Sequence, residues 1–256
     1  MNYLDMVASI TASACHDFAH DGFNNAYHVN FTTDRALRYH DKAVQENWHA
    51  SESLKIMLQP ENNFVEETFD NDERKVLRKR MISMILATDM AEHMSALNGI
   101  DYKVKHEGIT RDAGNGHKII DMESDQEKFD SQQKVLNFLV HASDLSTPTR
   151  EFDTLKEWTY LLFEEFFIQG DVEKSQGLPA SFLCDRAKTI VAKEQPGFCN
   201  YIVLPVWNLV HTFMPKMERC YTRAQENTEK WKTYEETQED MQVYDLKEIA
   251  YKSNAI

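Results

Sequence analysis

Apolar residues recur at steps of three and four along almost the whole chain. Leu77, Met81 and Ile85 follow this spacing, and a second run over residues 135–140 leads directly to His141. Such spacing places apolar side chains on one face of a helix. Alternation with a period of two, which would indicate a half-buried strand, is never sustained for long. The pattern therefore predicts an all-α protein.

The widest apolar stripe covers residues 152–169, and we interpret it as a helix that packs into the core. Two segments that mix glycine with charged residues, 108–128 and 170–179, are predicted to be loops. Gly197 is predicted to mark a break between two helices. These elements follow one another without an internal repeat or a linker, so residues 1–256 are predicted to form a single domain.

Composition agrees with a helical domain that has a sizeable core. The chain has 256 residues, of which 42% are hydrophobic. It contains only 8 glycines and 6 prolines. Because these two residues favour turns and interrupt regular structure, their scarcity favours long helices.

Charge and cysteine usage exclude several classes of partner. The chain has 28 basic and 42 acidic residues, which gives a net charge of −14. A surface this acidic repels nucleic acids and anionic lipids, so neither is an expected partner. The most apolar late segment, residues 201–210, is short and contains Pro205, so no membrane insertion is expected. The 4 cysteines are scattered, which favours free thiols in a reducing compartment such as the cytoplasm.

Two clusters of polar residues could bind metal ions. His16, Asp17 and His20 stand together, and His16 and His20 would share one face of a helix. Far downstream, His141 and Asp144 are again spaced for one helical face. Imidazole suits zinc, whereas carboxylate suits harder ions such as magnesium or manganese. The spacing of three leaves a second interpretation open for Asp144, which is a helix-terminal carboxylate bonded to nearby backbone groups.

Other polar motifs are less specific. Glu46 and His49 form a Glu-x-x-His motif, which also occurs in di-iron helical bundles, but such bundles need two of these motifs and two further glutamates. Asp89 and His93 lie in an otherwise apolar segment, and an internal hydrogen-bond network would explain them equally well.

The chain resembles the catalytic domain of class I cyclic nucleotide phosphodiesterases through six motifs in the same order. The motifs are His16-Asp17-x-x-His20-x-Gly22-x-x-Asn25, Tyr39-His40-Asp41 followed by Glu46-Asn47-Trp48-His49, Ala87-Thr88-Asp89-Met90 with His93, His141-x-x-Asp144-Leu145-Ser146-x-Pro148, Glu164-Glu165-Phe166-Phe167-x-Gln169-Gly170-Asp171, and Gln195-x-Gly197-Phe198. The resemblance runs from about residue 10 to about residue 230.

The resemblance implies a compact all-α domain of the HD type that uses two divalent ions. His16, Asp17 and Asp144 would be ligands of a zinc-like ion, and Asp17 would bridge to a second ion, magnesium or manganese. His20, Glu46 and Thr88 would hold the water molecules that coordinate the second ion. A hydroxide between the ions would hydrolyse cAMP, cGMP or both to nucleoside 5′-monophosphates.

The resemblance also implies a site for the cyclic nucleotide. The Gln195 amide both donates and accepts hydrogen bonds and can therefore match adenine or guanine. Phe198 would stack on one face of the base and Leu162 on the other. The same resemblance adds three substrate-binding residues, Asn25, Met90 and Thr147. Because Thr147 stands where cAMP-selective members tend to have asparagine, the base preference stays open.

One family motif has no counterpart in the chain. The family carries an upstream His-Asn-x-x-His that supplies the general acid and a further metal ligand, and nothing before His16 matches it. We therefore expect an N-terminally truncated catalytic domain that lacks the usual first helices and has low activity by itself. The alternative function is an impaired cyclic nucleotide or metal-binding regulatory module. A homodimer, or regulatory domains outside the chain, would be compatible with either function.

Overall fold

Every regular element in the described part of the chain is a helix. The computed structural model describes residues 2–106 and 125–235, and it contains no strand within these ranges. The all-α prediction is confirmed. The described residues divide into two compact units: those within 1–20, 33–145 and 206–217 form unit 1, and the others form unit 2. The single-domain prediction is not tested by this division.

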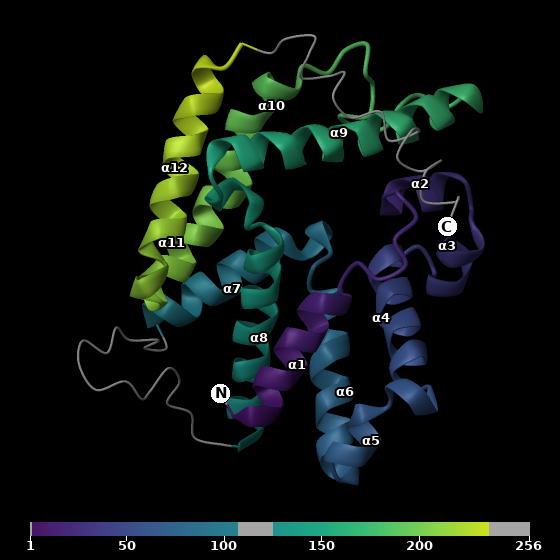
Figure 1. Cartoon of the computed structure of the whole chain (residues 1–256), viewed down its shortest axis with the longest axis vertical. Helices are drawn as coiled ribbons and strands as arrows, with labels where there is room; N and C mark the ends of the chain where they lie inside the picture. The colour runs from purple at the N-terminus through teal and green to yellow at the C-terminus, as the bar shows by residue number, and fades with distance from the viewer. Residues whose placement is uncertain (1, 107–124, 236–256) are drawn as a thin grey trace. The chain divides into compact units, whose positions relative to one another are not determined.

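Unit 1 contains seven whole helices of the described chain and most of an eighth. They are α1 (Tyr3–Cys15), α3 (Asp34–Tyr39), α4 (Val44–Met57), α5 (Phe64–Thr68), α6 (Asn71–Leu86), α7 (His93–His106), α8 (Asp125–Asp144) and α11 (Leu204–Phe213). Helices α1, α6 and α8 lie side by side, although α8 is far from the other two in sequence (Figure 1). Helix α8 begins at Asp125, so the loop predicted over residues 108–128 is wrong for its last residues, and the rest lies outside the described residues.

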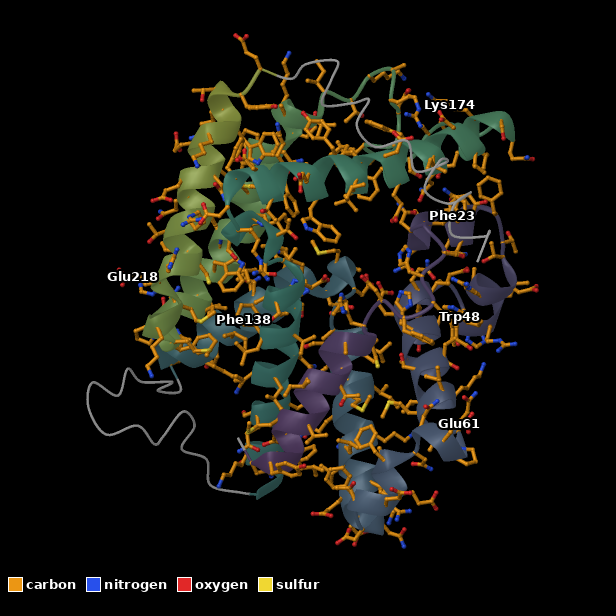
Figure 2. The ribbon with its side chains drawn as sticks, viewed as in Figure 1. Phe23, Trp48, Glu61, Phe138, Lys174 and Glu218 are labelled. Atoms are coloured by element: carbon orange, nitrogen blue, oxygen red, sulfur yellow. The ribbon has the colours of Figure 1, made fainter. Side chains whose placement is uncertain are left out.

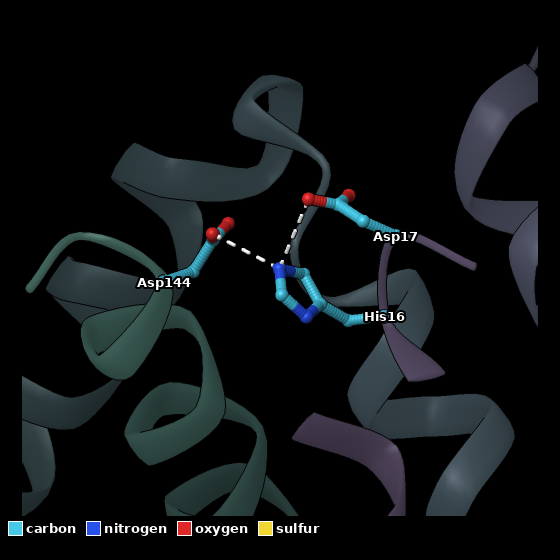
Figure 3. A group of neighbouring side chains, drawn as sticks. All are labelled: His16, Asp17 and Asp144. Carbon is cyan, nitrogen blue, oxygen red and sulfur yellow. Dashed lines mark hydrogen bonds and ion pairs between the residues drawn. The ribbon is translucent and has the colours of Figure 1, made fainter. Parts of the chain in front are cut away.

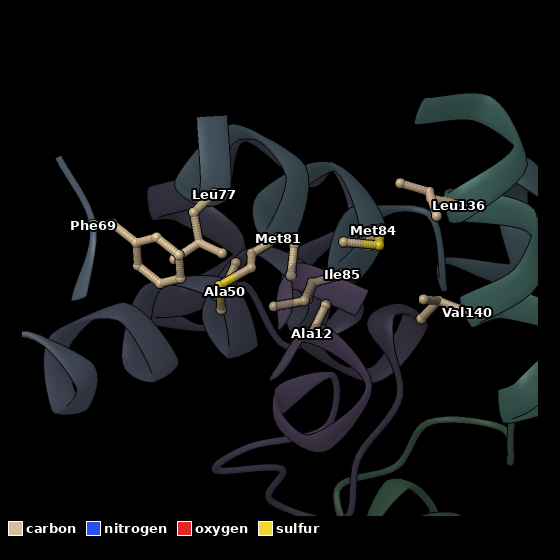
Figure 4. Close-up of a cluster of buried hydrophobic side chains, with 10 residues drawn as sticks. Ala12, Ala50, Phe69, Leu77, Met81, Met84, Ile85, Leu136 and Val140 are labelled. Atoms are coloured by element: carbon tan, nitrogen blue, oxygen red, sulfur yellow. The ribbon is translucent and has the colours of Figure 1, made fainter. Parts of the chain in front are cut away.

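The core of unit 1 is built from the apolar faces that the spacing predicted. Leu77, Met81 and Ile85 on α6 are almost fully buried, together with Leu136 and Val140 on α8 (Figure 4). Further along, Phe138 on α8 is buried (Figure 2). Its ring centre lies 6.5 Å from that of Phe213. This packing fixes α8, which carries His141 and Asp144 at its end.

A buried ion pair joins α1 to α6 inside this core. The Arg80 Nε atom lies 3.1 Å from the Asp5 Oδ1 atom, and the two side chains are only 2% and 3% exposed. The guanidinium also donates to the Gln133 side chain on α8 and lies over the Phe129 ring. Asp5 in turn accepts the Asn2 backbone N–H in a capping box at the start of α1. A single arginine thereby links three helices.

Unit 2 contains α2 (Asn25–Asn30), α9 (Phe152–Ser175), α10 (Val191–Phe198), a π-helical turn (Cys199–Val203) and α12 (Glu218–Thr233). Its core joins α9, α10 and α12 through apolar side chains that include Phe163, Phe167 and Trp231. The stripe over residues 152–169 is thus a helix, as predicted.

The predicted loop over residues 170–179 is wrong for its first part. Helix α9 continues to Ser175, and Gly170 is one of its buried residues. A Cβ atom at Gly170 would overlap the carbonyl oxygen of Cys184. Glycine is therefore present for close approach of two backbones and does not end the helix.

The break predicted at Gly197 is also displaced. Gly197 lies within α10, and the irregularity follows it as the π-helical turn. Pro205 is the second residue of α11, separated from this turn by one residue, and has no N–H to donate to the preceding turn. A wider turn of this kind is a common way to accommodate such a disruption.

The structure bears on the predictions about membrane insertion and about the cysteines. None of the helices in the described ranges combines the length and the apolar character that a membrane span requires. All four cysteines are free thiols, and Cys184 and Cys199 are buried.

Candidate metal centre and nucleotide site

Three of the predicted metal ligands meet in unit 1. The His16 Nε2 atom lies 3.1 Å from Asp144 Oδ1 and 3.3 Å from Asp17 Oδ2 (Figure 3). One ligand atom from each of the three residues lies within 4.8 Å of the others. No other group of three or more histidine, cysteine or acidic residues in the described chain is placed in this way. Residues separated by more than a hundred positions therefore lie together, and their role as metal ligands stays a prediction.

The local backbone explains how His16 and Asp17 come together. Helix α1 ends at Cys15 and the chain turns immediately, with Ala19 at a φ of +60°. The helical spacing proposed for His16 and His20 is therefore wrong, because His20 lies beyond the end of the helix. The His16 Nδ1 atom donates to the Ser13 carbonyl oxygen at 2.8 Å, which leaves Nε2 directed at the two carboxylates. A fixed ring of this kind is typical of a metal-binding histidine.

Asp144 is placed by the last turn of α8 and is 36% exposed. Its carboxylate accepts from His16, so the helix-terminal interpretation, in which only backbone groups satisfy it, does not describe its contacts. Among the described residues, this pairing brings the end of α8 to the end of α1.

Contacts within the cluster shift the pKa values of His16 and Asp17. Hydrogen bonds to Asp144 and then to Asp17 raise the pKa of His16 to about 11, in spite of partial burial. Burial would raise the pKa of Asp17, but the His16 hydrogen bond and nearby histidines outweigh it, so the pKa is lowered. In the absence of a cation, a proton on His16 thus balances the two carboxylates. A divalent ion can take the place of that proton.

His49 is a further candidate site residue, which was not among the predicted metal ligands or water-holding residues. Its side chain is 2% exposed, and its Nε2 atom lies 3.8 Å from Asp17 Oδ1. Its Nδ1 atom bonds to the Phe18 carbonyl oxygen at 2.8 Å, and its ring stacks on that of His20 at 5.4 Å. Burial lowers the pKa of His49, so it stays neutral near pH 7. The Glu-x-x-His motif contained this signal, because it placed His49 one turn after Glu46 on α4.

A buried pair of histidines supports the end of α8. The His93 Nδ1 atom on α7 lies 2.9 Å from His141 Nε2. Burial lowers the pKa of both imidazoles, and for His141 the neighbouring His93 adds to the effect. An internal hydrogen bond therefore explains His93, although its partner is His141, whereas Asp89 accepts the Ala91 backbone N–H.

The other residues predicted for unit 1 have varied surroundings. Glu46 lies in the first turn of α4 and is half-buried, while His20 is exposed. Thr88 is buried, and its hydroxyl donates to the Ile85 carbonyl oxygen at 2.8 Å, which leaves its oxygen free to accept. Met90 is 46% exposed. Their roles toward water or substrate remain predictions.

The residues predicted to bind the base belong to unit 2. Gln195 lies on α10 and is 5% exposed, and in the described chain its side-chain amide makes no hydrogen bond. Phe198 ends the same helix with 38% of its surface exposed, and Leu162 on α9 is 48% exposed. Asn25 begins α2 and Thr147 begins a short 3₁₀ turn, and both are half-buried.

A largely buried hydrogen-bond network connects α9 to the start of α2 within unit 2. The Gln169 side chain accepts the Asn24 backbone N–H at 2.9 Å and donates to Glu173. Glu173 is 1% exposed and accepts both the backbone and the hydroxyl of Ser181. These contacts explain why Gln169, and Glu173 one turn further on, are buried polar residues in a helix, whereas Asp171 between them is exposed.

Comparison with known proteins identifies the family. The family described as 3′5′-cyclic nucleotide phosphodiesterase matches residues 1–224. The chain belongs to this phosphodiesterase family. The match covers both the candidate metal centre of unit 1 and the Gln195 motif of unit 2, so the resemblance seen in the sequence is confirmed.

Related phosphodiesterases are known from flies and choanoflagellates. The 3′,5′-cyclic-AMP phosphodiesterase, isoform F, of Drosophila melanogaster is 37% identical over 212 residues, which are 81% of this chain and 30% of that protein. The phosphodiesterase domain of the RhoPDE fusion protein from Salpingoeca rosetta is 30% identical, with a TM-score of 0.79 over 91% of this chain and 69% of that one. A second structure of the rhodopsin phosphodiesterase domain gives a TM-score of 0.78 at 31% identity, over 90% and 66% of the two chains. The chain thus spans about a third of the curated relative's length.

Proposed function

We propose that this phosphodiesterase chain hydrolyses 3′,5′-cyclic nucleotides to nucleoside 5′-monophosphates in cyclic nucleotide signalling. The observation that carries the proposal is the convergence of His16, Asp17 and Asp144 on one point. The names of the relatives support the substrate class, because the fly proteins are 3′,5′-cyclic-AMP phosphodiesterases.

The donor set fits a divalent ion. One imidazole nitrogen and two carboxylate oxygens suit a zinc-like ion, and the carboxylate of Asp17 has a second oxygen for a magnesium or manganese ion. When bound, such ions supply a hydroxide near neutral pH and positive charge for the phosphate. The chain itself has a net charge of −14, so this positive charge is needed for an anionic substrate.

The chain's own residues orient these groups. The Ser13 carbonyl oxygen fixes the His16 ring, and His49 lies against the other oxygen of Asp17. His20, Glu46 and Thr88 are proposed to hold water around the second ion. Each of them offers an acceptor or a donor from α4, from the turn after α1 or from the end of α6.

The purine is proposed to bind in unit 2. A buried amide without an internal partner is costly unless a ligand or water satisfies it, and Gln195 is such an amide. Phe198 and Leu162 offer the apolar surface for the two faces of the base, and Asn25 and Thr147 are further proposed substrate-binding residues of this unit. Met90, which is also proposed to bind substrate, belongs to unit 1. The proposed substrate is cAMP, cGMP or both, and the proposed location is the cytoplasm.

The test is hydrolysis by the purified chain with zinc and magnesium. We expect slow conversion of cAMP or cGMP to the 5′-monophosphate, because a missing general acid costs about 10²–10⁴-fold in rate. Asp144→Ala should abolish the remaining turnover and weaken zinc binding by more than about 100-fold. Ser143→Ala removes an exposed neighbour on the same helix and is the matched control.

Two results would argue against the proposal. Cyclic nucleotide binding without any turnover, also in a longer protein that carries the upstream motif, would favour the regulatory module instead. Turnover that persists unchanged in Asp144→Ala would show that the cluster is not the reaction centre.

A further inference from the structure

A cavity in unit 1 lies at the edge of the core, at the opposite end of α4 from Glu46. It has a volume of about 190 Å³ and is lined by α4, α5, α6 and the residues just before α5. Leu77 and Met81, both nearly fully buried, form part of its wall, and both belong to the core cluster shown in Figure 4. The cavity is therefore an apolar recess that the core leaves open.

The rest of the apolar wall comes from four side chains that are only partly covered. Leu54 and Met57 on α4 and Val65 on α5 are half-buried, and Leu58 just beyond α4 is 55% exposed. These side chains leave hydrocarbon surface exposed beside the recess. An apolar ligand that displaces water from this surface lowers the free energy of the system.

The polar part of the lining has an excess of positive charge. Glu66 is held by Asn63, whose side chain donates to Oε2 at 2.9 Å, and by Arg74, whose Nη1 atom lies 3.6 Å from Oε1. The remaining donors of Arg74 bond to the backbone oxygens of Glu66 and Phe69. Glu66 and Arg74 thus satisfy each other.

Arg78 is the remaining charge of the lining. It is exposed on α6, and among the described residues it has neither an ion pair nor a side-chain hydrogen bond. Two arginines and one glutamate in the lining leave one net positive charge, on a chain whose overall charge is −14. An apolar recess with one unpaired guanidinium is complementary to a hydrocarbon chain that ends in an anion.

We propose that this cavity binds a single-chain apolar carboxylate, a free fatty acid of medium length. The hydrocarbon lies against Leu54, Leu77 and Met81, and the carboxylate pairs with Arg78. The volume is below the roughly 300–1,000 Å³ typical of pockets for drug-sized ligands, which favours a chain of medium length over a long one. This site is independent of the proposed phosphodiesterase function, since it contains none of the metal-binding residues.

The test uses octanoate as the probe and isothermal titration calorimetry as the measurement on the full chain. We expect a dissociation constant of about 1 mM, the affinity usual for a ligand of this size. Octanol has the same chain without the charge and should bind about tenfold more weakly. Binding should also raise the unfolding temperature of the protein.

Two variants and one control separate this site from general adsorption. Arg78→Gln removes the unpaired charge and should weaken octanoate about tenfold, but leave octanol unchanged. Leu58→Asp places a negative charge in the lining at an exposed position and should abolish octanoate binding. Lys75→Gln removes an exposed charge from the same helix outside the cavity and should bind octanoate like the parent chain.

Circular dichroism melts establish that each variant is folded. Equal binding of octanoate and octanol, or undiminished octanoate binding in folded Arg78→Gln, would overturn the proposal, as would the absence of any binding at 10-fold the expected dissociation constant of about 1 mM.

Discussion

The most informative single residue is His49, because its contacts connect the candidate metal centre to α4. It is buried, bonds to the Phe18 carbonyl oxygen and approaches Asp17. Groups that orient a metal ligand typically affect metal affinity by about 10–100-fold. We therefore expect His49→Leu to weaken zinc binding to that extent, and His49→Gln, whose amide can reach Asp17, to restore part of it.

Zinc titration of the purified variants, with circular dichroism as a check on folding, measures this effect. A purely structural role for His49 would lower the unfolding temperature in both variants and leave zinc affinity the same. Such a result would remove His49 from the candidate site.

At the scale of residues, the sequence indicated which side chains form the cluster but not how they are held. His16, Asp17 and Asp144 could be named from motif spacing and resemblance, since these report which chemistry is present. The pairing of His93 with His141 was missed because it depends on the packing of α7 against α8. Two residues 48 positions apart give no local signal of such a contact.

At the scale of elements, the glycines show why loop prediction failed. Gly170 lies inside α9, where the Cys184 backbone approaches too closely for a side chain. We expect Gly170→Ala to lower the free energy of unfolding by about 2–4 kcal/mol, because either the helix or the Cys184 segment must move. Gly99→Ala in α7 is the matched control, since no atom lies near its added Cβ.

Urea unfolding of both variants provides the measurement. Gly99→Ala should be neutral or stabilise the protein by up to about 1 kcal/mol, because alanine favours helix. Equal effects of the two substitutions would show that helix propensity, and not close approach, explains Gly170.

The buried pair Asp5–Arg80 is a second element-scale feature. Removal of one partner leaves the other charge buried and uncompensated, so Asp5→Leu should cost about 3–5 kcal/mol of unfolding free energy. The double variant Asp5→Leu/Arg80→Met should recover a large part of that loss, because it buries no charge. A double-mutant cycle by urea unfolding measures the coupling, and additive losses would contradict it.

Helix positions were predictable wherever one face is continuously apolar. The stripes over residues 135–140 and 152–169 became α8 and α9 because periodic burial dominates local preference there. The residues that pack backbones together, or that pair charges inside the core as Asp5 and Arg80 do, required the tertiary structure.

At the scale of the whole molecule, the histidines determine how stability responds to acid. Burial lowers the pKa of His49, His93 and His141, so the folded protein keeps them neutral at pH values where the unfolded chain binds protons. Because the unfolded state then binds more protons, stability is present above the unfolded pKa of 6.5 and is lost as pH falls below it. Each group can contribute a slope of up to about 1.4 kcal/mol per pH unit.

The metal-free protein should also lose stability on the alkaline side, for the opposite reason. The pKa of His16 is raised to about 11, so its stabilising proton is retained in the folded state and is fully effective below the unfolded value of 6.5. Between these two values the folded state binds the extra proton, and stability therefore falls as pH rises.

Urea unfolding in EDTA should show a maximum of the unfolding free energy near pH 6.5. Asp144→Asn removes the largest cause of the raised pKa, so it should flatten the alkaline decline and leave the acid decline intact. Saturating zinc should flatten it as well, because the ion replaces the proton on His16. An alkaline decline that is the same in all three cases would show that His16 does not exchange a proton for a metal ion.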